Sequence, residues 1–358
     1  MITILYIYRN KDLERVKKSL DSLSNQTTKD FQIVFVDYGS DDFYKNALSE
    51  LIVQYPNINY IYSYHNQQPW SRAKALNIGI KHVNTEFVFV SDIDMIFRYD
   101  FIEKLYSLKN DELSVCFSVG FLDEKESKQN KSFESYKIKK RSGIGAEGLS
   151  LFSVKALKKI GGFDEFLHFW GAEDEDIHSR LVNLGLQKQF YHQEILMLHQ
   201  WHKSYRRTES KRLTNELQLS NIVRINQQHQ KYNKLNRIIQ INTSQWGKTI
   251  SESEYKALNK PEQTRNLSNR KSEIDHFLFF EINHLPHGVF RFQILESNIP
   301  YSLKYRIKKV IGKPVQSYYS MKDINDKLLL HLISFYNTNH YTYIIGDDLE
   351  IIELTIKI

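Results

Sequence analysis

The sequence has one cysteine and no long uninterrupted apolar run, and both shortages exclude whole classes of protein. Cys116 has no second cysteine to pair with, which excludes an internal disulfide framework and favours a reducing cytoplasm. No stretch approaches the roughly 18 apolar residues of a membrane-spanning helix. The first apolar run, residues 2–8, is too short to span a bilayer, and no charged region precedes it as in a secretion signal. We therefore expect a cytoplasmic protein.

The sequence also lacks the glycine pattern of a dinucleotide-binding oxidoreductase. The segment after the first apolar run reads "YRNKDLER" where such an enzyme has G-x-G-x-x-G, so a dehydrogenase is excluded. The net charge of +7 suggests a polyanionic partner, either nucleic acid or an anionic membrane. The aromatic residues are spread through apparent strands and do not gather beside a basic stripe, so we predict no nucleic-acid partner.

The first 100 residues alternate between strand and helix signals. Near-continuous apolar runs are followed by amphipathic stretches such as "KDLERVKKSLDSL" and "SRAKALNIGIKHV". The four apolar runs cover residues 2–8, 31–37, 58–64 and 86–92. This alternation is typical of an α/β fold with a parallel sheet covered by helices on both faces. Ligands bind such sheets beyond the carboxyl ends of the strands.

The rest of the chain divides into several further segments. We expect a long polar loop, a strand followed by a helix, a long polar helix that begins with the basic "KSYRRTESKR", and an Asn- and Ser-rich linker. These segments cover residues 122–147, 148–166, 203–235 and 251–272. Strands of a second unit are expected at 276–282, 288–295 and 341–346. We therefore predict a first domain over residues 1–240 and a smaller C-terminal α+β accessory domain of unknown role over 241–358.

Three aspartates fall at the expected strand ends. Asp92 and Asp94 follow one run as a D-x-D pair, which could bind one hard divalent cation and leave positions for phosphate oxygens. Such a cation would neutralise the charge on a departing diphosphate. Asp37 follows another run and could accept the N3–H of uracil, or simply organise an Asp-Gly turn.

Two histidines follow a later apolar run, in "MLHQWHKSY". His199 and His202 added to the D-x-D carboxylates would shift the preference from magnesium toward manganese or a similar ion. Two histidines three apart do not make a zinc site by themselves, and either one could be a structural residue. The same elements could suit a metal-dependent nuclease, although that enzyme needs no uridine pocket.

Four consecutive acidic residues, 173–176, stand behind a Trp-Gly step and ahead of an apolar stripe. Ile177, Leu181 and Leu184 have helical spacing, so a helix should begin near Glu173. Acidic side chains in a first turn oppose the positive end of the helix dipole, which alone would explain the cluster.

The motifs together resemble a known family. The order of V-D-x-G-S, "SRAKALNIGI", D-x-D and "GGFDEFLHFWGAEDEDIHSRLVNLG" is similar to GT-A glycosyltransferases of family 2. The acidic segment resembles the W-G-G-E-D-D-D element of β-1,4-galactosyltransferases and its counterpart in bacterial chondroitin polymerases. The resemblance covers about residues 1–205. It implies a Rossmann-like GT-A fold, with a nucleotide-sugar-binding mixed sheet flanked by helices.

The resemblance also implies site residues. For the acceptor, Trp170 would stack on the sugar ring, Glu173 would bind hydroxyl groups and Asp174 would be the catalytic base. The donor would be held by Asp37, Arg72 and Asp92. Metal ligands would be Asp94, His199 and His202, with His202 the weaker candidate of the two histidines. For Glu175 and Asp176 we expect no role beyond opposing the helix dipole. Ala172 departs from the family pattern, because it replaces the second glycine of W-G-G.

From this resemblance we expect an inverting glycosyltransferase that uses Mn²⁺ or Mg²⁺. It would move a hexose or N-acetylhexosamine from a UDP-sugar to a glycan or lipid-linked saccharide in bacterial surface or capsule polysaccharide synthesis. We expect peripheral contact with an anionic membrane at the inner face of the plasma membrane, with "KIKKR" (137–141) and "KSYRRTESKR" as candidate contacts. The alternative is a non-catalytic nucleotide-sugar or glycan-binding protein on the same fold.

Overall fold

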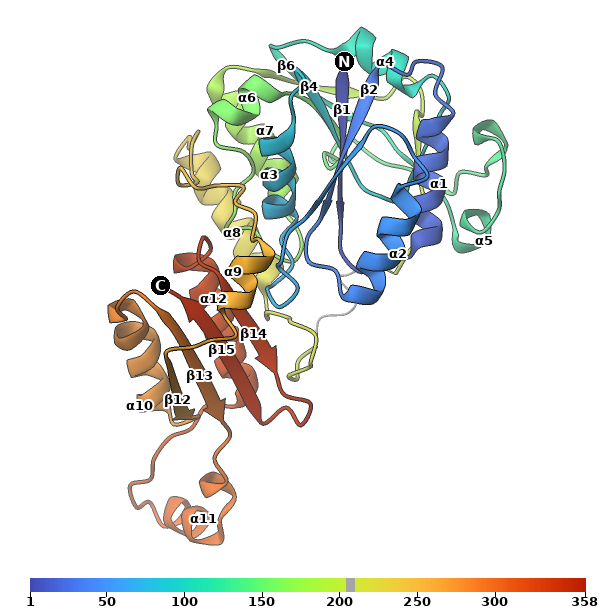
Figure 1. Ribbon diagram of the computed structural model, residues 1–358. Helices are drawn as coiled ribbons and strands as arrows, with labels where there is room; N and C mark the ends of the chain where they lie inside the picture. The colour runs from blue at the N-terminus through green and yellow to red at the C-terminus, as the bar shows by residue number, and fades with distance from the viewer. Residues whose placement is uncertain (204–209) are drawn as a thin grey trace. The chain divides into compact units, whose positions relative to one another are not determined.

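The computed structural model describes residues 1–203 and 210–358, which form two compact units (Figure 1). Unit 1 contains residues 1–66, the described residues from 70 to 203, and 223–249. Unit 2 contains residues 67–69, the described residues from 210 to 222, and 250–358.

Unit 1 is built on a mixed seven-stranded sheet with the strand order β10-β6-β9-β4-β1-β2-β3. All neighbouring strands are parallel except β9, which pairs antiparallel with both β4 and β6. The strands are β1 (Ile2–Tyr8), β2 (Phe31–Asp37), β3 (Ile58–Tyr62), β4 (Phe87–Ser91), β6 (Leu113–Phe117), β9 (Ser150–Ser153) and β10 (Gln187–Tyr191). The predicted α/β class is therefore confirmed, and so is the mixed sheet that the family resemblance implied.

Helices cover both faces of this sheet (Figure 1). Alternate residues of β1 point to opposite faces: Ile4 and Tyr6 belong to one buried cluster, and Leu5 and Ile7 to the other. The first cluster is packed by α1 (Leu13–Ser24), α2 (Asp42–Ile52) and α4 (Phe101–Leu108). The second is packed by α3 (Arg72–His82), α6 (Val154–Lys159) and α7 (Glu173–Leu184). Two covered faces explain why the strands are apolar throughout.

A second, small sheet extends unit 1, in the order β5-β11-β7-β8. Its strands are β5 (Met95–Phe97), β7 (Gly120–Phe121), β8 (Lys140–Arg141) and β11 (Met197–His199). The predicted polar loop of residues 122–147 contains β8, the short helix α5 (Glu124–Ser127) and a 3₁₀ turn, Phe133–Ser135. Unit 1 also contains α8 (Ile222–Leu235), apart from its first residue.

Unit 2 has its own four-stranded sheet, in the order β12-β13-β15-β14. The strands are β12 (Gln263–Ser268), β13 (Val289–Leu295), β14 (Tyr341–Ile345) and β15 (Ile351–Lys357), and only the β12–β13 pair is parallel. The helices are α9 (Glu252–Ala257), α10 (Lys271–His276), α11 (Leu303–Val310) and α12 (Met321–Phe335). None of the described helices combines the length and apolarity needed to span a bilayer.

Three local predictions for the second half are wrong. Residues 276–282 are not a strand but continue α10 as a π-helical turn, Phe277–Glu281, which buries Phe277 and Leu278 and exposes Phe279 and Phe280. A short apolar run does not distinguish a strand from a helix. The predicted linker contains α9 and β12, whose sequence is polar because β12 is a largely exposed edge strand.

The predicted helix over 203–235 is also shorter than expected. Residues 204–209 lie outside the described part of the chain, residues 210–221 are irregular, and α8 begins only at Ile222. Asn221 has a φ of 60°, a left-handed conformation that a right-handed helix cannot include.

The first unit runs past the predicted boundary at residue 240. Trp246 belongs to the buried cluster that contains α3, and Lys81 lies 3.8 Å from the centre of its ring. Gly247 packs so closely that a Cβ there would lie 2.6 Å from the Asn77 carbonyl oxygen. Residues 241–249 are thus part of the first unit, and the separate folding of the C-terminal part stays a prediction.

Candidate active site

A carboxylate and two imidazoles meet where the central sheet joins the small sheet. Asp94 lies between β4 and β5, and Met95 of β5 is paired with His199 of β11. Asp94 Oδ1 is 3.7 Å from His199 Nε2, and Asp94 Oδ2 is 3.4 Å from His202 Nε2. Antiparallel pairing of β5 with β11 therefore brings Asp94 close to two predicted ligands from a distant part of the chain, His199 and His202.

These three side chains could hold one metal ion. Their potential ligand atoms all lie within 4.8 Å of one another, and two ligands about 2.1 Å from one ion are roughly 3–4 Å apart. Asp94 Oδ1 is buried and has no hydrogen-bond partner among the described residues. His202 Nδ1 is 2.9 Å from the Lys203 carbonyl oxygen and donates to it, so in a neutral ring Nε2 is the acceptor that faces Asp94. This chemistry fits a cation.

The Arg72 side chain contacts both the D-x-D segment and the acidic segment. Arg72 is the first residue of α3, whose N-cap Ser71 accepts a hydrogen bond from the Lys74 amide. Arg72 Nη1 donates to Asp174 Oδ1 at 2.7 Å, and Nη2 lies 3.4 Å from Asp92 Oδ1. The predicted donor and acceptor residues therefore meet at one guanidinium group.

Gly148 also contacts this group, and no motif in the sequence indicates its role. Its carbonyl oxygen accepts a hydrogen bond of 2.8 Å from Arg72 Nη2. A Cβ at this position would lie 2.9 Å from Asp174 Oδ2, so a larger residue would displace that carboxylate.

The backbone ahead of α7 turns sharply before the two predicted acceptor-side acids. Phe169, Gly171 and Ala172 all have positive φ, of 62°, 94° and 76°. Ala172 therefore adopts the left-handed conformation that glycine adopts without strain. Asn226 of α8 donates to the carbonyl oxygens of His168 and Trp170, at 2.9 and 3.1 Å. The turn is held by side-chain hydrogen bonds, and Trp170 remains half-buried beside it.

The two acids at the start of α7 have perturbed pKa values. Burial, together with the neighbouring Asp174, raises the pKa of Glu173 to about 7, although Arg72 opposes the shift. Burial also raises the pKa of Asp174, again against the effect of Arg72. Perturbed carboxyl groups that share a cation are typical of sites that move protons.

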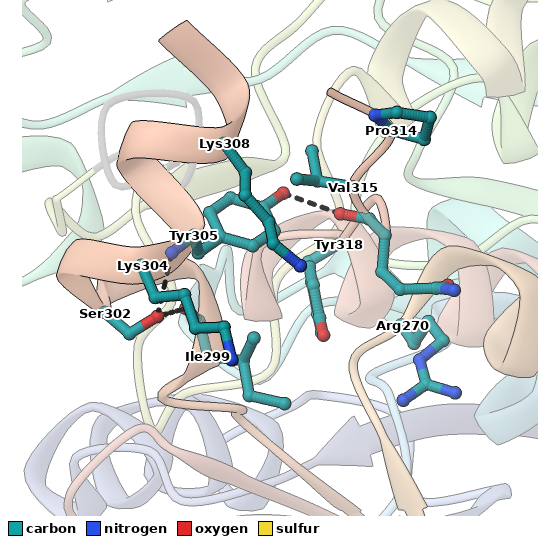
Figure 2. Close-up of a pocket in the computed structure, with 10 residues that line it drawn as sticks. Arg270, Ile299, Ser302, Lys304, Tyr305, Lys308, Pro314, Val315 and Tyr318 are labelled. Carbon is teal, nitrogen blue, oxygen red and sulfur yellow. Dashed lines mark hydrogen bonds between the residues drawn. The ribbon is translucent and has the colours of Figure 1, made fainter. Parts of the chain in front are cut away.

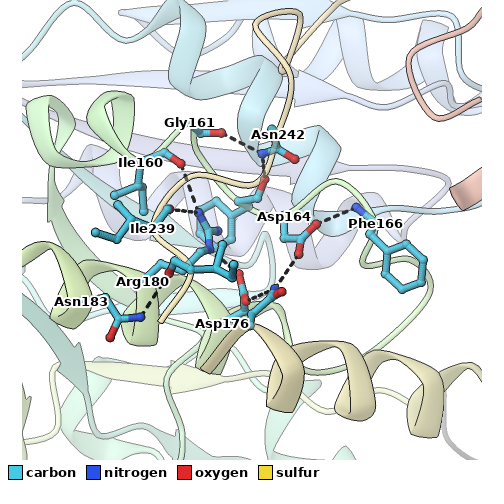
Figure 3. A network of polar contacts seen from close by, with 12 residues as sticks. Ile160, Gly161, Asp164, Phe166, Asp176, Arg180, Asn183, Ile239 and Asn242 are labelled. Carbon is cyan, nitrogen blue, oxygen red and sulfur yellow. Dashed lines mark hydrogen bonds and ion pairs between the residues drawn. The ribbon is translucent and has the colours of Figure 1, made fainter. Parts of the chain in front are cut away.

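Asp176 does more than oppose the helix dipole, so that interpretation is corrected. Asp176 and Arg180 form an ion pair of 2.7 Å, and each side chain is only 1% exposed. Asn233 of α8 donates to both Asp176 Oδ1 and Asp164 Oδ2, and His229 lies 2.7 Å from the same Asp164 oxygen. Figure 3 shows Asp164, Asp176 and Arg180 in this network. The network fixes the first turn of α7 against α8. Glu175 is exposed, as a residue that acts only on the dipole can be.

Asp37 is fully buried at the end of β2. Its Oδ1 accepts from the Ser40 amide at 2.8 Å, and its Oδ2 accepts from the Tyr60 hydroxyl at 3.1 Å. Gly39 follows with a φ of 78°, and a Cβ there would lie 2.2 Å from the Asn66 amide nitrogen. The carboxylate thus organises the turn, and its contact with a uracil base stays a prediction.

Comparison with known families agrees with this geometry. Residues 3–161 match the family described as "Glycosyl transferase family 2", and residues 128–203 match the one described as "N-terminal domain of galactosyltransferase". The first match extends from β1 to α6 and includes the D-x-D pair. The second includes the acidic segment and the two predicted metal ligands His199 and His202.

Individual relatives are more distant. Human chondroitin sulfate synthase 3 is 25% identical over an alignment of 166 residues, and the match covers 41% of this chain and 19% of that protein. This chain thus spans about a fifth of the relative's length.

Three solved structures are also similar. A mannosyltransferase from Pyrobaculum calidifontis, in complex with GDP-mannose and Mn²⁺, has a TM-score of 0.42 and 18% identity, over 57% of this chain and 58% of that one. TarS from S. aureus has a TM-score of 0.43 and 15% identity, over 56% and 36% of the two chains. GalNAc-T7 with UDP, GalNAc and Mn²⁺ has a TM-score of 0.43 and 14% identity, over 56% and 43%.

The α/β sheet carries the D-x-D pair at a strand end and the acidic segment beside it, and residues 3–203 match two overlapping glycosyltransferase families. These matches indicate a glycosyltransferase whose residues 3–161 are similar to family 2 and whose residues 128–203 are similar to the galactosyltransferase domain.

Proposed function

We propose that this enzyme transfers a hexose or an N-acetylhexosamine from a UDP-sugar to a glycan acceptor, with inversion at the anomeric carbon and with a divalent metal. The arrangement around Arg72 carries the proposal: a donor-side carboxylate, Asp92, and an acceptor-side carboxylate, Asp174, lie on the same guanidinium group. A transferase needs the two substrates in contact, and the contact of Asp92 and Asp174 with one guanidinium group supports neighbouring donor and acceptor sites.

Asp94, His199 and His202 would hold the metal. One carboxylate and two imidazoles favour Mn²⁺ over Mg²⁺, which prefers oxygen ligands and water. The ion would neutralise the negative charge of the departing UDP diphosphate. The three protein ligands would leave further coordination positions for phosphate oxygens. Arg72, which lies 3.4 Å from Asp92, would share the charge of the diphosphate.

Asp174 would be the general base and Glu173 the acceptor-binding acid. Inversion by a single displacement requires a base within hydrogen-bond reach of the attacking hydroxyl, on the face opposite the diphosphate. Arg72 and Gly148 fix the Asp174 carboxylate at the start of α7. Trp170 offers an apolar surface on which a sugar ring can stack.

The acceptor would be a glycan or a lipid-linked saccharide in bacterial surface or capsule polysaccharide synthesis, and the enzyme would work at the inner face of the plasma membrane. The basic charge of the chain supports this location, because the cytoplasmic leaflet is anionic. Galactose and N-acetylgalactosamine are the donor sugars suggested by the galactosyltransferase-like segment.

Two experiments test this proposal. A thermal-shift panel of UDP-sugars with Mn²⁺ should show stabilisation by one sugar class, because a ligand that binds the native state raises its stability. Proton NMR of the fresh product should show a β-linkage from an α-linked donor, read from the anomeric coupling. An α-linkage, or full activity in excess chelator, would refute inversion or the metal requirement respectively.

A further inference from the structure

Unit 2 carries a helical lobe whose apolar face is exposed in the described part of the chain. Residues 297–317 leave the sheet after β13, form α11 and return ahead of α12, and Figure 1 shows α11 at the far end of this excursion. Leu303, Ile307, Val310 and Ile311 have the spacing of one helix face. Their side chains are 74%, 50%, 86% and 57% exposed.

The lobe is nevertheless a well-formed structure. Ser302 caps α11 by accepting a hydrogen bond from the Tyr305 amide, and Gly312 follows the helix with a φ of 70°. Buried Asn269 ties the two ends of the lobe together, because its side chain accepts from the Ser297 amide and donates to the Tyr319 carbonyl oxygen. An eight-residue helix with an exposed apolar face has little stability in water by itself, so we expect another surface to cover this face.

The charge of the lobe identifies the kind of surface. Residues 297–321 contain five basic residues and no aspartate or glutamate, whereas the rest of 250–358 has more acidic than basic residues. The five are Lys304, Arg306, Lys308, Lys309 and Lys313. A nucleic acid would satisfy these charges but would leave the apolar face in water. A lipid surface satisfies both, because an amphipathic helix buries its apolar face among acyl chains while its cations contact anionic headgroups.

A pocket beside the helix adds room for a headgroup. It has a volume of about 410 Å³, and Lys304, Lys308 and Arg270 contribute its cationic groups (Figure 2). Tyr305 and Tyr318 form part of its wall, and Tyr305 is held by a hydrogen bond of 2.6 Å to the Gln316 carbonyl oxygen. The cations of the pocket thus lie on the flank of the exposed apolar face.

We propose that the lobe of residues 297–317 docks this enzyme on an anionic phospholipid bilayer, with the apolar face of α11 inserted at the headgroup boundary. The proposal assigns the membrane contact to unit 2 and not to the basic runs at 137–141 and 203–212. It deepens the proposed location of the enzyme but does not depend on its reaction, because the predicted nucleotide-binding residues lie in unit 1.

The test measures how the full chain binds lipid vesicles. The wild-type protein should float with vesicles of phosphatidylcholine containing phosphatidylglycerol and not with pure phosphatidylcholine, and binding should weaken as salt rises. Since each cation near a membrane strengthens binding about fivefold, Lys308→Gln combined with Lys309→Gln should weaken it about 25-fold. Lys137→Gln with Lys139→Gln is the matched control and should have no effect.

A second pair of variants tests the apolar face. Val310→Asp should weaken vesicle binding at least tenfold, because it removes a valine side chain that would insert into the bilayer and adds an anion. Val53→Asp is the control, since Val53 is 84% exposed in unit 1 and Val310 is 86% exposed. Thermal shift by UDP-sugar with Mn²⁺ should be the same in all variants. That readout separates this proposal from the proposed function, because either can fail alone.

Three outcomes would overturn the proposal. The first is wild-type binding with no preference for anionic vesicles, and the second is equal binding by the wild type and the α11 variants. The third is no vesicle binding, with Val310→Asp instead abolishing a dimer in analytical ultracentrifugation or a complex with nucleic acid in a gel shift.

Discussion

The Asp176–Arg180 ion pair tests how burial changes the contribution of an ion pair to the free energy of unfolding. Replacing Arg180 with Met would leave the Asp176 carboxylate buried and without its cation, which typically costs about 3–5 kcal/mol. At about 2–4 °C per kcal/mol for a unit of this size, the melting temperature should fall by roughly 6–20 °C. Calorimetry and urea unfolding would measure both quantities.

Lys17→Met is the matched control. Lys17 and Asp21 also form an i,i+4 pair at 2.7 Å, but their side chains are 47% and 44% exposed. Water solvates the remaining carboxylate there, so the loss should be about 0–1 kcal/mol. Asp176→Asn with Arg180→Met should recover part of the loss, since it removes the unpaired charge. A single Arg180→Met variant no less stable than Lys17→Met would refute the reasoning.

Three further predictions concern the site. Asp94→Asn should lose far more transfer activity and Mn²⁺ affinity than His202→Ala, measured by calorimetric titration, and the reverse ranking would mean that the ligands are misassigned. Asp174→Asn should cut turnover by about 10²–10⁴-fold with UDP-sugar binding nearly intact, and near-normal turnover would exclude it as the base. Because the pKa of Glu173 is raised to about 7, kcat/KM should rise with pH through that value, and Glu173→Gln should remove this limb. The same raised pKa means that Glu173 contributes stability at low pH, which is lost as pH rises through about 7. A Glu173→Gln profile identical to the wild type would assign the limb to another group.

Much of unit 1 could be predicted because its signals are local. Apolar runs such as residues 2–8 and 31–37 became strands, and the helix that begins at Glu173 was indicated by the spacing of Ile177 and Leu181. In unit 2 the same reasoning failed at 276–282, because a short apolar run suits a buried helical turn as well as a strand.

The sequence by itself determined which chemical groups the enzyme has: a D-x-D pair, two late histidines and an acidic helix start. It did not determine which groups meet. The contact of Asp94 with His199 depends on the antiparallel pairing of β5 with β11, and the bond between Arg72 and Asp174 depends on the packing of α3 beside α7. Burial, too, was decided only by the tertiary structure. Four consecutive acidic residues look alike in a sequence, yet Glu175 is exposed to water. Asp176 is buried, where it pairs with Arg180 and accepts a hydrogen bond from Asn233 of α8. The physical reason is that the environment of a charge is set by residues distant in the chain, and no local pattern records them.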